Sequence, residues 1–281
     1  MKVGIVGAGT MGAGIAQVCA MAGHKVILFD LNPKAVENAR ASITKNLDKG
    51  ISLGKTTEEI KSTALNLLST TFNLEDLKVD LVIEAIVERL DVKVKLFKEL
   101  AEINGEKTIL ATNTSSIPIT QISAAIPHPE RVVGIHFFNP AHIMRLVEVV
   151  SGAHTSEEVA KTAFDLVKQI KKTPIMAKDS PGFIVNRVAR HYYVEGLKVL
   201  EENVATHEDI DALLESSGFK MGPFRLMDLI GVETNFSVTE SMYNLFYQDS
   251  KFRPSRIQKQ KVDAGHHGRK SGKGFYTYAK N

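Results

Sequence analysis

The sequence predicts an α/β fold with a mostly parallel sheet and helices on both of its faces, followed by an all-helical C-terminal domain. Three observations support this prediction. Over residues 1–180, short apolar runs alternate with longer amphipathic segments, as in parallel sheets that helices cover on both sides. A glycine-rich turn follows the first apolar run. Beyond residue 180, the apolar residues recur with a helical period.

The expected strands and helices of the first domain alternate along the chain. Strands are expected at residues 3–6, 24–30, 80–86, 108–112, 131–137 and 174–178. Helices are expected at residues 11–22, 33–49, 57–68, 92–103, 119–125 and 157–170. Residues 145–150 follow the preceding strand too closely for a crossover helix, so we expect them to form its antiparallel hairpin partner.

The second domain is expected to begin with a helix at Ser180 and Pro181, a pair typical of an N-cap followed by proline in the first turn. This helix should run to about residue 203. Thr206 and Asp209 have the spacing of a capping box, which marks the start of another helix. The later helices are expected at residues 209–217, around 226 and around 242.

Length and composition limit the class of protein. A chain of 281 residues is long enough for two domains, predicted here as residues 1–180 and 181–281. The net charge of +3 is too small for nucleic-acid binding, which needs a concentrated basic face. Because Cys19 is the single cysteine, no internal disulfide or cysteine-based metal site can form. We therefore expect a cytoplasmic protein without a bound metal.

One uncharged stretch at the N-terminus resembles a targeting segment or a membrane span. Residues 3–23 contain no charged side chain, but they include six glycines. Glycine disrupts the hydrophobic helix that a signal peptide or a membrane span needs. A buried strand, a tight turn and a buried helix explain the missing charge, so we expect neither a targeting segment nor contact with a membrane.

The glycine-rich turn has the spacing of a dinucleotide-binding motif. At such a turn, glycine lets backbone N–H groups approach a pyrophosphate, and the N-terminus of the following helix adds partial positive charge. The context of strand, turn and apolar helix predicts a Rossmann-type fold, and a purely structural turn is the alternative. The residues expected to bind the cofactor here are Gly7, Ala8, Gly9, Thr10, Met11 and Gly12.

Asp30 ends the second predicted strand and lies 18 residues after Gly12. A carboxylate at this place can accept hydrogen bonds from the adenine ribose hydroxyls, and it would repel the 2′-phosphate of NADP. No arginine lies beside it in the sequence. The sequence therefore favours NAD as the cofactor, with a helix-capping aspartate as the alternative role.

A histidine and a glutamate are expected to meet across the predicted hairpin. His136 lies near the end of its strand, where ligands meet an open parallel sheet. In a hairpin that turns over residues 139–144, it faces Glu148 at about 5 Å between Cβ atoms. An imidazole backed by a carboxylate can take the proton of an alcohol while hydride leaves the carbon. This predicts a dehydrogenase of secondary alcohols, although the spacing alone also fits a core histidine beside a surface glutamate.

Two further polar side chains are candidates to contact a substrate. Ser115 follows another strand and would lie at the same edge of the sheet, but an ordinary helix cap fits its sequence context as well. Asn186 lies on the first long helix of the second domain. A single asparagine on a helix is also compatible with a plain surface position.

Together these stretches resemble the 3-hydroxyacyl-CoA dehydrogenase family, above all the bacterial members that act on 3-hydroxybutyryl-CoA. Several similar stretches in the same order are more specific than one glycine motif. They run nearly from end to end of the chain: GAGTMGAGIA, IEAIVERLDVK, TNTSS, HFFNPA, LVEVV, PGFIVNR, MGPF and GRKSGKGFY.

The resemblance implies reversible, NAD-dependent oxidation of a short-chain (S)-3-hydroxyacyl-CoA thioester to the 3-ketoacyl-CoA. It implies His136 as general base with Glu148 as its partner, and Ser115 and Asn186 as residues that position the substrate. It also implies a homodimer formed through the C-terminal domain, which would bind substrate as well. The residues implied near the nicotinamide half of NAD are Glu88, Lys93, Ser115, Asn139 and Lys270.

The region expected to contact the CoA phosphates departs from the family pattern. The family usually carries lysines on the helical segment after the second strand. Here Lys49 fits that pattern, but Leu53 stands where a second lysine is expected. Asn46 and Lys55 are candidates to replace it, and we expect Asn46 and Lys49 to bind the substrate.

Two other functions stay open at this point. Dehydrogenases of free 3-hydroxy acids also join a nucleotide-binding fold to helices, but they rely on a lysine in the helical domain, and the HFFNP and LVEVV stretches argue against them. A non-catalytic nucleotide-binding protein on the same scaffold would need neither His136 nor Glu148.

Overall fold

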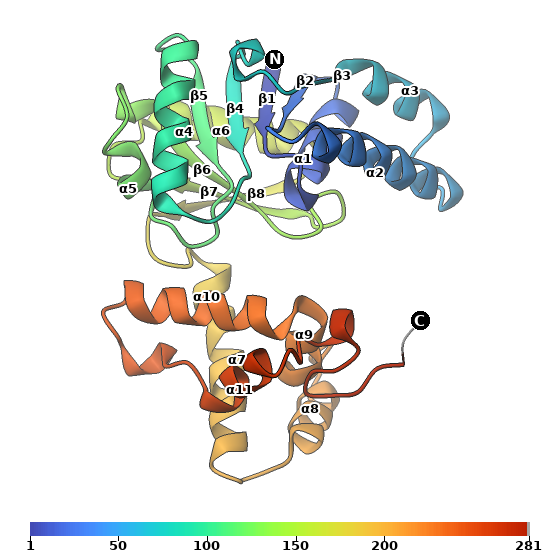
Figure 1. The fold of residues 1–281 in the computed structure, drawn as a ribbon, viewed down its shortest axis with the longest axis vertical. Coiled ribbons are helices and arrows are strands. Elements are labelled where there is room, and N and C mark those ends of the chain that lie inside the picture. The colour runs from blue at the N-terminus through green and yellow to red at the C-terminus, as the bar shows by residue number, and fades with distance from the viewer. Residues whose placement is uncertain (280–281) are drawn as a thin grey trace. The chain divides into compact units, whose positions relative to one another are not determined.

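The computed structural model describes residues 1–279, which form two compact units that divide after Ser180 (Figure 1). The first unit is built on one eight-stranded sheet with the order β3-β2-β1-β4-β5-β6-β7-β8. Neighbouring strands are parallel except for β6 and β7, which are antiparallel. The strands are β1 (Lys2–Val6), β2 (Lys25–Phe29), β3 (Leu68–Thr71), β4 (Leu81–Glu84), β5 (Ile109–Thr112), β6 (Val132–Phe137), β7 (Leu146–Ser151) and β8 (Thr173–Lys178).

Helices cover the sheet of the first unit on both sides. In Figure 1, α4 lies in front of the strands and α6 lies behind them. The predicted α/β fold with a mostly parallel, Rossmann-type sheet is thereby confirmed. The helices are α1 (Thr10–Met21), α2 (Pro33–Ser52), α3 (Glu58–Leu67), α4 (Leu90–Ile103), α5 (Ile119–Ser123) and α6 (Glu157–Gln169), with 3₁₀ turns η1 (Leu74–Asp76) and η2 (Pro129–Arg131).

The core of the first unit explains why its central strands are apolar throughout. Ile5 on β1, Leu28 on β2 and Ile83 on β4 are all fully buried, and so is Ile15 on α1. Strands that helices cover on both faces must bury every side chain, so they show continuous apolar runs rather than alternation.

The prediction for the first unit missed one strand. β3 (Leu68–Thr71) pairs in parallel with β2 at the edge of the sheet. Its sequence LSTT has one apolar residue, and only Leu68 is buried. An edge strand with one side in solvent needs little apolar surface, so the apolar pattern did not reveal it.

The second unit is helical, as predicted. Its helices are α7 (Val185–Glu201), α8 (His207–Ser216), α9 (Pro223–Ile230), α10 (Val232–Leu245) and α11 (Arg256–Asp263), with 3₁₀ turns η3 (Ser250–Phe252) and η4 (Arg269–Ser271). The predicted helix start at Thr206 is confirmed, because the Thr206 hydroxyl caps α8 by accepting a hydrogen bond from Asp209 N at 3.2 Å.

Two predictions for the second unit were wrong. The first helix begins at Val185 and not at Ser180, because Gly182 and Phe183 have φ angles of 73° and 48° in the left-handed region, which a right-handed helix cannot contain. The prediction also missed α11, whose sequence RIQKQKVD is mostly polar. Ser255 caps this helix by accepting from Gln258 N.

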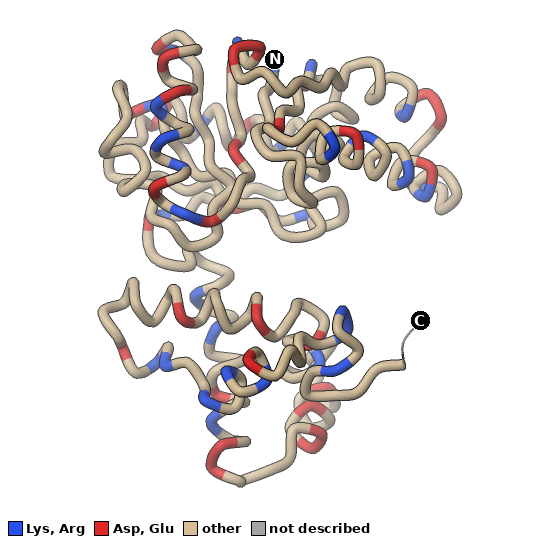
Figure 2. The backbone as a smooth tube through the Cα atoms, viewed as in Figure 1, with Lys and Arg blue, Asp and Glu red and all other residues tan. Residues whose placement is uncertain are grey.

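Charged residues of both signs are distributed along the chain. Figure 2 shows acidic and basic positions interspersed on α2 and α4. Among residues 1–279, every helix is too short or too polar to cross a membrane. The same part of the chain holds no group of three His, Cys, Asp or Glu side chains placed to bind a metal ion.

Candidate active site

The glycine-rich turn joins β1 to α1, and its glycines differ in what they touch. Gly7 has φ of 103°, and a Cβ atom there would lie 2.6 Å from the carbonyl oxygen of Ala85. A Cβ atom on Gly12 would lie 1.7 Å from the carbonyl oxygen of Gly7. Packing of the turn therefore requires both glycines.

Gly9 is not required by packing within the protein. It is the N-cap of α1, and a Cβ atom on it would meet no protein atom within 4 Å. Protein packing therefore does not demand glycine here. The bare backbone at a helix N-terminus fits the close approach of a pyrophosphate, so the turn suits a dinucleotide.

Asp30 follows β2 and is tied to the same turn. One carboxylate oxygen accepts a hydrogen bond from Ala8 N at 2.8 Å, and the other accepts from Asn32 N at 2.9 Å. The helix α2 is capped by Asn32 and not by Asp30. The carboxylate thus stands half-buried beside the glycine turn, where an adenine ribose would lie.

His136 and Glu148 face each other across the hairpin of β6 and β7. Their Cα atoms are paired in the antiparallel register, and Nδ1 of the imidazole lies 2.7 Å from a carboxylate oxygen of Glu148. His136 is 5% exposed and Glu148 is fully buried. The predicted pairing is confirmed in its register and its contact, and the alternative of a surface glutamate is wrong.

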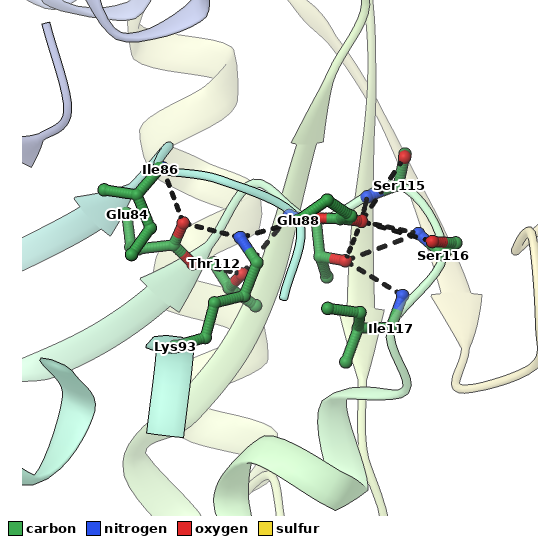
Figure 3. A network of polar contacts seen from close by, with 9 residues as sticks. Glu84, Ile86, Glu88, Lys93, Thr112, Ser115, Ser116 and Ile117 are labelled. Atoms are coloured by element: carbon green, nitrogen blue, oxygen red, sulfur yellow. Dashed lines mark hydrogen bonds and ion pairs between the residues drawn. The ribbon is translucent and has the colours of Figure 1, made fainter. Parts of the chain in front are cut away.

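A second carboxylate holds the loop that carries Ser115 (Figure 3). Glu88 Oε1 accepts from the Thr114 hydroxyl at 2.5 Å and from the backbone N–H groups of Ser115 at 2.9 Å and Ser116 at 3.2 Å. The alternative of Ser115 as a helix cap is wrong, because the N-cap residue of α5 is Pro118. Ser115 instead lies in a loop whose geometry Glu88 fixes.

Glu88 is also paired with a buried lysine. Lys93 Nζ lies 3.2 Å from Glu88 Oε2 and 2.6 Å from Glu84 Oε1. Burial raises the pKa of the Glu88 carboxyl, but the charge of Lys93 and the hydrogen bonds from Thr114 and Ser115 outweigh it, so the net shift of this pKa is downward. Lys93 is 1% exposed, so any influence on a ligand passes through its two carboxylate partners or requires it to move.

Glu84 is not among the site residues predicted from the sequence. This residue ends β4 and is fully buried. It accepts hydrogen bonds from Ile86 N at 2.7 Å and from the Thr112 hydroxyl at 2.7 Å, besides its contact with Lys93. An acidic residue within an otherwise apolar strand needs a buried partner, and that feature of the sequence could have revealed it.

These groups share one edge of the sheet. Asp30 and the loop with Ser115 follow the carboxyl ends of β2 and β5, Glu84 ends the parallel strand β4, and His136 lies near the end of β6. Asn113 links two of these strand ends, because its side-chain oxygen accepts from Phe137 N at 2.9 Å. Ligands of open α/β sheets bind at this edge.

Two family models together match nearly the whole chain. The model of the 3-hydroxyacyl-CoA dehydrogenase NAD binding domain matches residues 2–180, and the model of the C-terminal domain of the same enzymes matches residues 182–278. The chain belongs to the 3-hydroxyacyl-CoA dehydrogenase family. NAD is accordingly the dinucleotide of its first domain.

Similar proteins carry related names. The chain is 49% identical over 98% of its length to 3-hydroxyadipyl-CoA dehydrogenase of Escherichia coli and spans 58% of that longer protein. It is 41% identical over its whole length to 3-hydroxybutyryl-CoA dehydrogenase of Clostridioides difficile, which it covers completely. The crystal structure of (S)-3-hydroxybutyryl-CoA dehydrogenase from Ralstonia eutropha matches with a TM-score of 0.95 at 43% identity, covering 99% of both chains.

The other predicted site residues lie on separate elements. Asn139 is exposed just after β6, and Asn186 lies in the first turn of α7. Lys270 lies in η4 and forms an ion pair with Glu233 of α10. Its loop is held in place by the buried carboxylate of Asp228, which accepts from Phe275 N and Tyr276 N at 2.9 Å each.

The residues expected to contact CoA lie on α2. Lys49 is exposed, and Asn46 donates a hydrogen bond to the side chain of Gln17 at 3.4 Å. Burial and the charges of Lys172 and Lys49 lower the pKa of the His142 imidazole. Both lysines therefore lie near enough to this imidazole for their charges to act on it.

Proposed function

We propose that this protein oxidises a short-chain (S)-3-hydroxyacyl-CoA to the 3-ketoacyl-CoA with NAD, and catalyses the reverse reduction, with 3-hydroxybutyryl-CoA as its substrate. The observation that carries the proposal is the 2.7 Å contact between His136 and the buried Glu148 at the ligand-binding edge of the sheet. Family membership and the names of the full-length relatives support the substrate class.

The strand order supports the placement of the two halves of NAD. Asp30 follows β2 on one side of β1 and would bind the adenine ribose, as the glycine turn after β1 binds the pyrophosphate. The nicotinamide half then extends to the other side of β1, over β4, β5 and β6. Glu88, Ser115 and His136 belong to that side, and we place Lys93 and Asn139 there as well.

His136 is proposed to act as the general base. Because a carboxylate only accepts, we assign the imidazole proton to Nδ1 in the contact with Glu148, and Nε2 would take the proton of the 3-hydroxyl group. NAD, when bound, supplies the acceptor for the hydride that leaves C3. Glu148 stabilises the imidazolium that forms, and in the reverse reaction His136 returns the proton to the 3-keto oxygen.

Two residues are proposed to position the reacting oxygen. The Ser115 hydroxyl would hydrogen-bond the 3-oxygen, because Glu88 fixes the backbone of its loop. Asn186 would contact the acyl chain from the second unit. Lys270 would contribute positive charge toward the cofactor, and Asn46 and Lys49 would contact CoA.

We further propose a homodimer formed through the helical unit. A groove of about 630 Å³ runs between α7 and α8, and its lining includes Val199, Ile210 and Leu214. Val188 and Leu213 on the same helices are 69% and 67% exposed. Exposed apolar surface of this kind is typical of subunit interfaces. A cytoplasmic location is part of the proposal and is supported by the single cysteine.

An absorbance assay of NADH consumption tests the function directly. We expect rapid oxidation of NADH with acetoacetyl-CoA and much slower oxidation with free acetoacetate, because the CoA moiety supplies binding energy. Longer 3-ketoacyl-CoA esters and 3-ketoadipyl-CoA measure the acyl preference. Equal rates with acetoacetate and its CoA ester would contradict the proposal and favour a dehydrogenase of free 3-hydroxy acids.

A further inference from the structure

Three charged side chains form a chain of contacts at the end of β4 (Figure 3). Lys93 Nζ lies between the carboxylates of Glu84 and Glu88, at 2.6 Å and 3.2 Å. The side chains of Lys93 and Glu84 are 1% and 0% exposed, and that of Glu88 is 38% exposed. The function proposed above uses Glu88 and Lys93 but assigns nothing to Glu84.

The hydrogen-bond partners of Glu84 suit a carboxylate. Its Oε1 accepts from two N–H donors, Ile86 N and Lys93 Nζ. Its Oε2 accepts from the Thr112 hydroxyl, whose own oxygen already accepts from Thr114 N. A carboxylate accepts all three of these hydrogen bonds. Two carboxylates and one ammonium leave this cluster with one net negative charge.

The cluster lies against the turn that would bind the dinucleotide. Ala85, the residue after Glu84, donates from its backbone N to Val6 O at 2.7 Å. Its carbonyl oxygen packs so closely on Gly7 that a Cβ atom there would lie 2.6 Å away. The charge is therefore buried on the β4 side of the turn, which is the side given above to the nicotinamide half.

We propose that the Glu84 carboxylate shifts the binding preference of the site toward the oxidised dinucleotide, by giving the cluster of Glu84, Lys93 and Glu88 a net negative charge on the nicotinamide side of the turn. The inference rests on the proposed function, because it needs NAD to bind in the orientation described. NAD⁺ and NADH share their phosphates and riboses, and they differ in the positive charge of the oxidised ring. A negative charge near that ring stabilises NAD⁺ and has little effect on NADH.

Burial allows a single charge to change the affinity for a ligand that it does not touch. Water and salt screen exposed charges, whereas Glu84 and Lys93 are shielded from both. At an effective dielectric constant of about 20, one unit charge within about 10 Å changes an affinity about tenfold. Without Glu84, Lys93 and Glu88 would balance each other and leave no net charge.

The variant Glu84→Gln tests the inference through binding of both dinucleotides. Glutamine removes the charge and keeps an oxygen for Ile86 N and Lys93 Nζ. Its NH₂ group replaces the oxygen that accepts from the Thr112 hydroxyl, and that hydroxyl can rotate to accept instead. NADH is titrated by its fluorescence, and NAD⁺ by displacement of NADH. We expect the ratio of the NAD⁺ Kd to the NADH Kd to rise about tenfold, whereas simple loss of structure would weaken both to the same extent.

Asp91→Asn is the matched control, and Glu88→Gln is the second variant. Asp91 lies on α4, as Lys93 does, but its side chain is 66% exposed and paired with Arg89. We therefore expect the ratio of the NAD⁺ Kd to the NADH Kd in Asp91→Asn to stay within about twofold of the original. Glu88→Gln removes a carboxylate that is partly in solvent, and it should raise the ratio even if Glu84→Gln does not fold.

The outcomes separate this inference from the proposed function. A folded Glu84→Gln protein with an unchanged Kd ratio would overturn the inference, and so would an unchanged ratio in Glu88→Gln if the first variant does not fold. If the original protein binds neither dinucleotide, or does not oxidise 3-hydroxybutyryl-CoA with NAD, the proposed function fails instead. A raised ratio in Glu84→Gln with the Asp91→Asn ratio unmoved supports the inference.

Discussion

Two buried carboxylates on the same sheet have partners of different chemistry. Glu148 on β7 contacts the imidazole of His136 at 2.7 Å, and Glu84 on β4 contacts the ammonium of Lys93 at 2.6 Å. Both glutamates are 0% exposed. An imidazole can serve as an acid or a base, whereas an ammonium only donates hydrogen bonds.

Because their partners differ, the two buried glutamates are expected to have different roles. The pair of Glu148 with histidine can hold and release a proton during turnover, so it suits acid–base chemistry. Glu84 and Lys93, together with Glu88, carry one net negative charge, which suits the electrostatics of cofactor binding. Burial alone therefore does not identify the catalytic glutamate, since its partner decides the role.

The largest effect that separates the two pairs is expected from Glu148→Gln. The glutamine side chain can donate an N–H to Nδ1 of His136, which places the imidazole proton on Nε2 and blocks its action as a base. We expect kcat for oxidation of 3-hydroxybutyryl-CoA to fall by about 10²–10⁴, with NADH binding retained. Steady-state rates and a fluorescence titration of NADH measure the two quantities.

Glu84→Gln is the comparison for that experiment. It neutralises an equally buried carboxylate on the same sheet, but it should leave the shape of the pH–rate profile as it was. A loss of kcat in Glu84→Gln as large as in Glu148→Gln would remove the distinction between the two pairs.

A smaller effect is expected at the other end of the dinucleotide. Asp30→Ala removes the carboxylate proposed to bind the adenine ribose, so NAD affinity should fall about tenfold and NADP affinity much less. Loss of the hydrogen bond from Ala8 N disturbs the turn for both cofactors, so the ratio of the two affinities is the informative quantity. An NAD/NADP ratio equal to the original would exclude Asp30 from ribose recognition.

The smallest effect concerns stability in acid. The pKa of Glu88 is lowered in the folded protein, because the charge of Lys93 and the hydrogen bonds from its loop outweigh burial. A lowered pKa stabilises the fold at pH values above the unfolded pKa of about 4.3, and this contribution is lost as the pH falls through the folded value. Glu88→Gln should therefore lower Tm by about 2–4 °C at pH 7.

Melting of Glu88→Gln at different pH values tests the direction of this pH dependence. The difference in Tm between Glu88→Gln and the original protein should shrink as the pH falls below about 4. Melting curves across this range measure it. A difference that stays constant with pH would mean that the carboxylate charge of Glu88 does not stabilise the fold.

Local pattern predicted the hairpin pair and the glycine turn. Side chains on a strand alternate with a period of two, so a short turn fixes which residues oppose each other, and His136 meets Glu148 as expected. The turn after β1 is similarly local, because its glycines pack on one another and on the neighbouring strand.

The contact between Glu84 and Lys93 could not be predicted from local sequence patterns. The two residues are nine positions apart, and the loop between β4 and α4 has no periodicity that predicts its path. The early expectation for α7 failed for a related reason, since the positive φ angles of Gly182 and Phe183 are set by the surrounding structure and not by the proline before them.

His136→Ala tests the central claim most directly. Turnover of 3-hydroxybutyryl-CoA with NAD and binding of NADH are measured on the same preparation. We predict that kcat falls by at least about a hundredfold while the Kd for NADH stays within a few-fold of the original, because the imidazole transfers the proton and does not hold the dinucleotide. A variant that retains more than about a tenth of the original kcat would contradict the account.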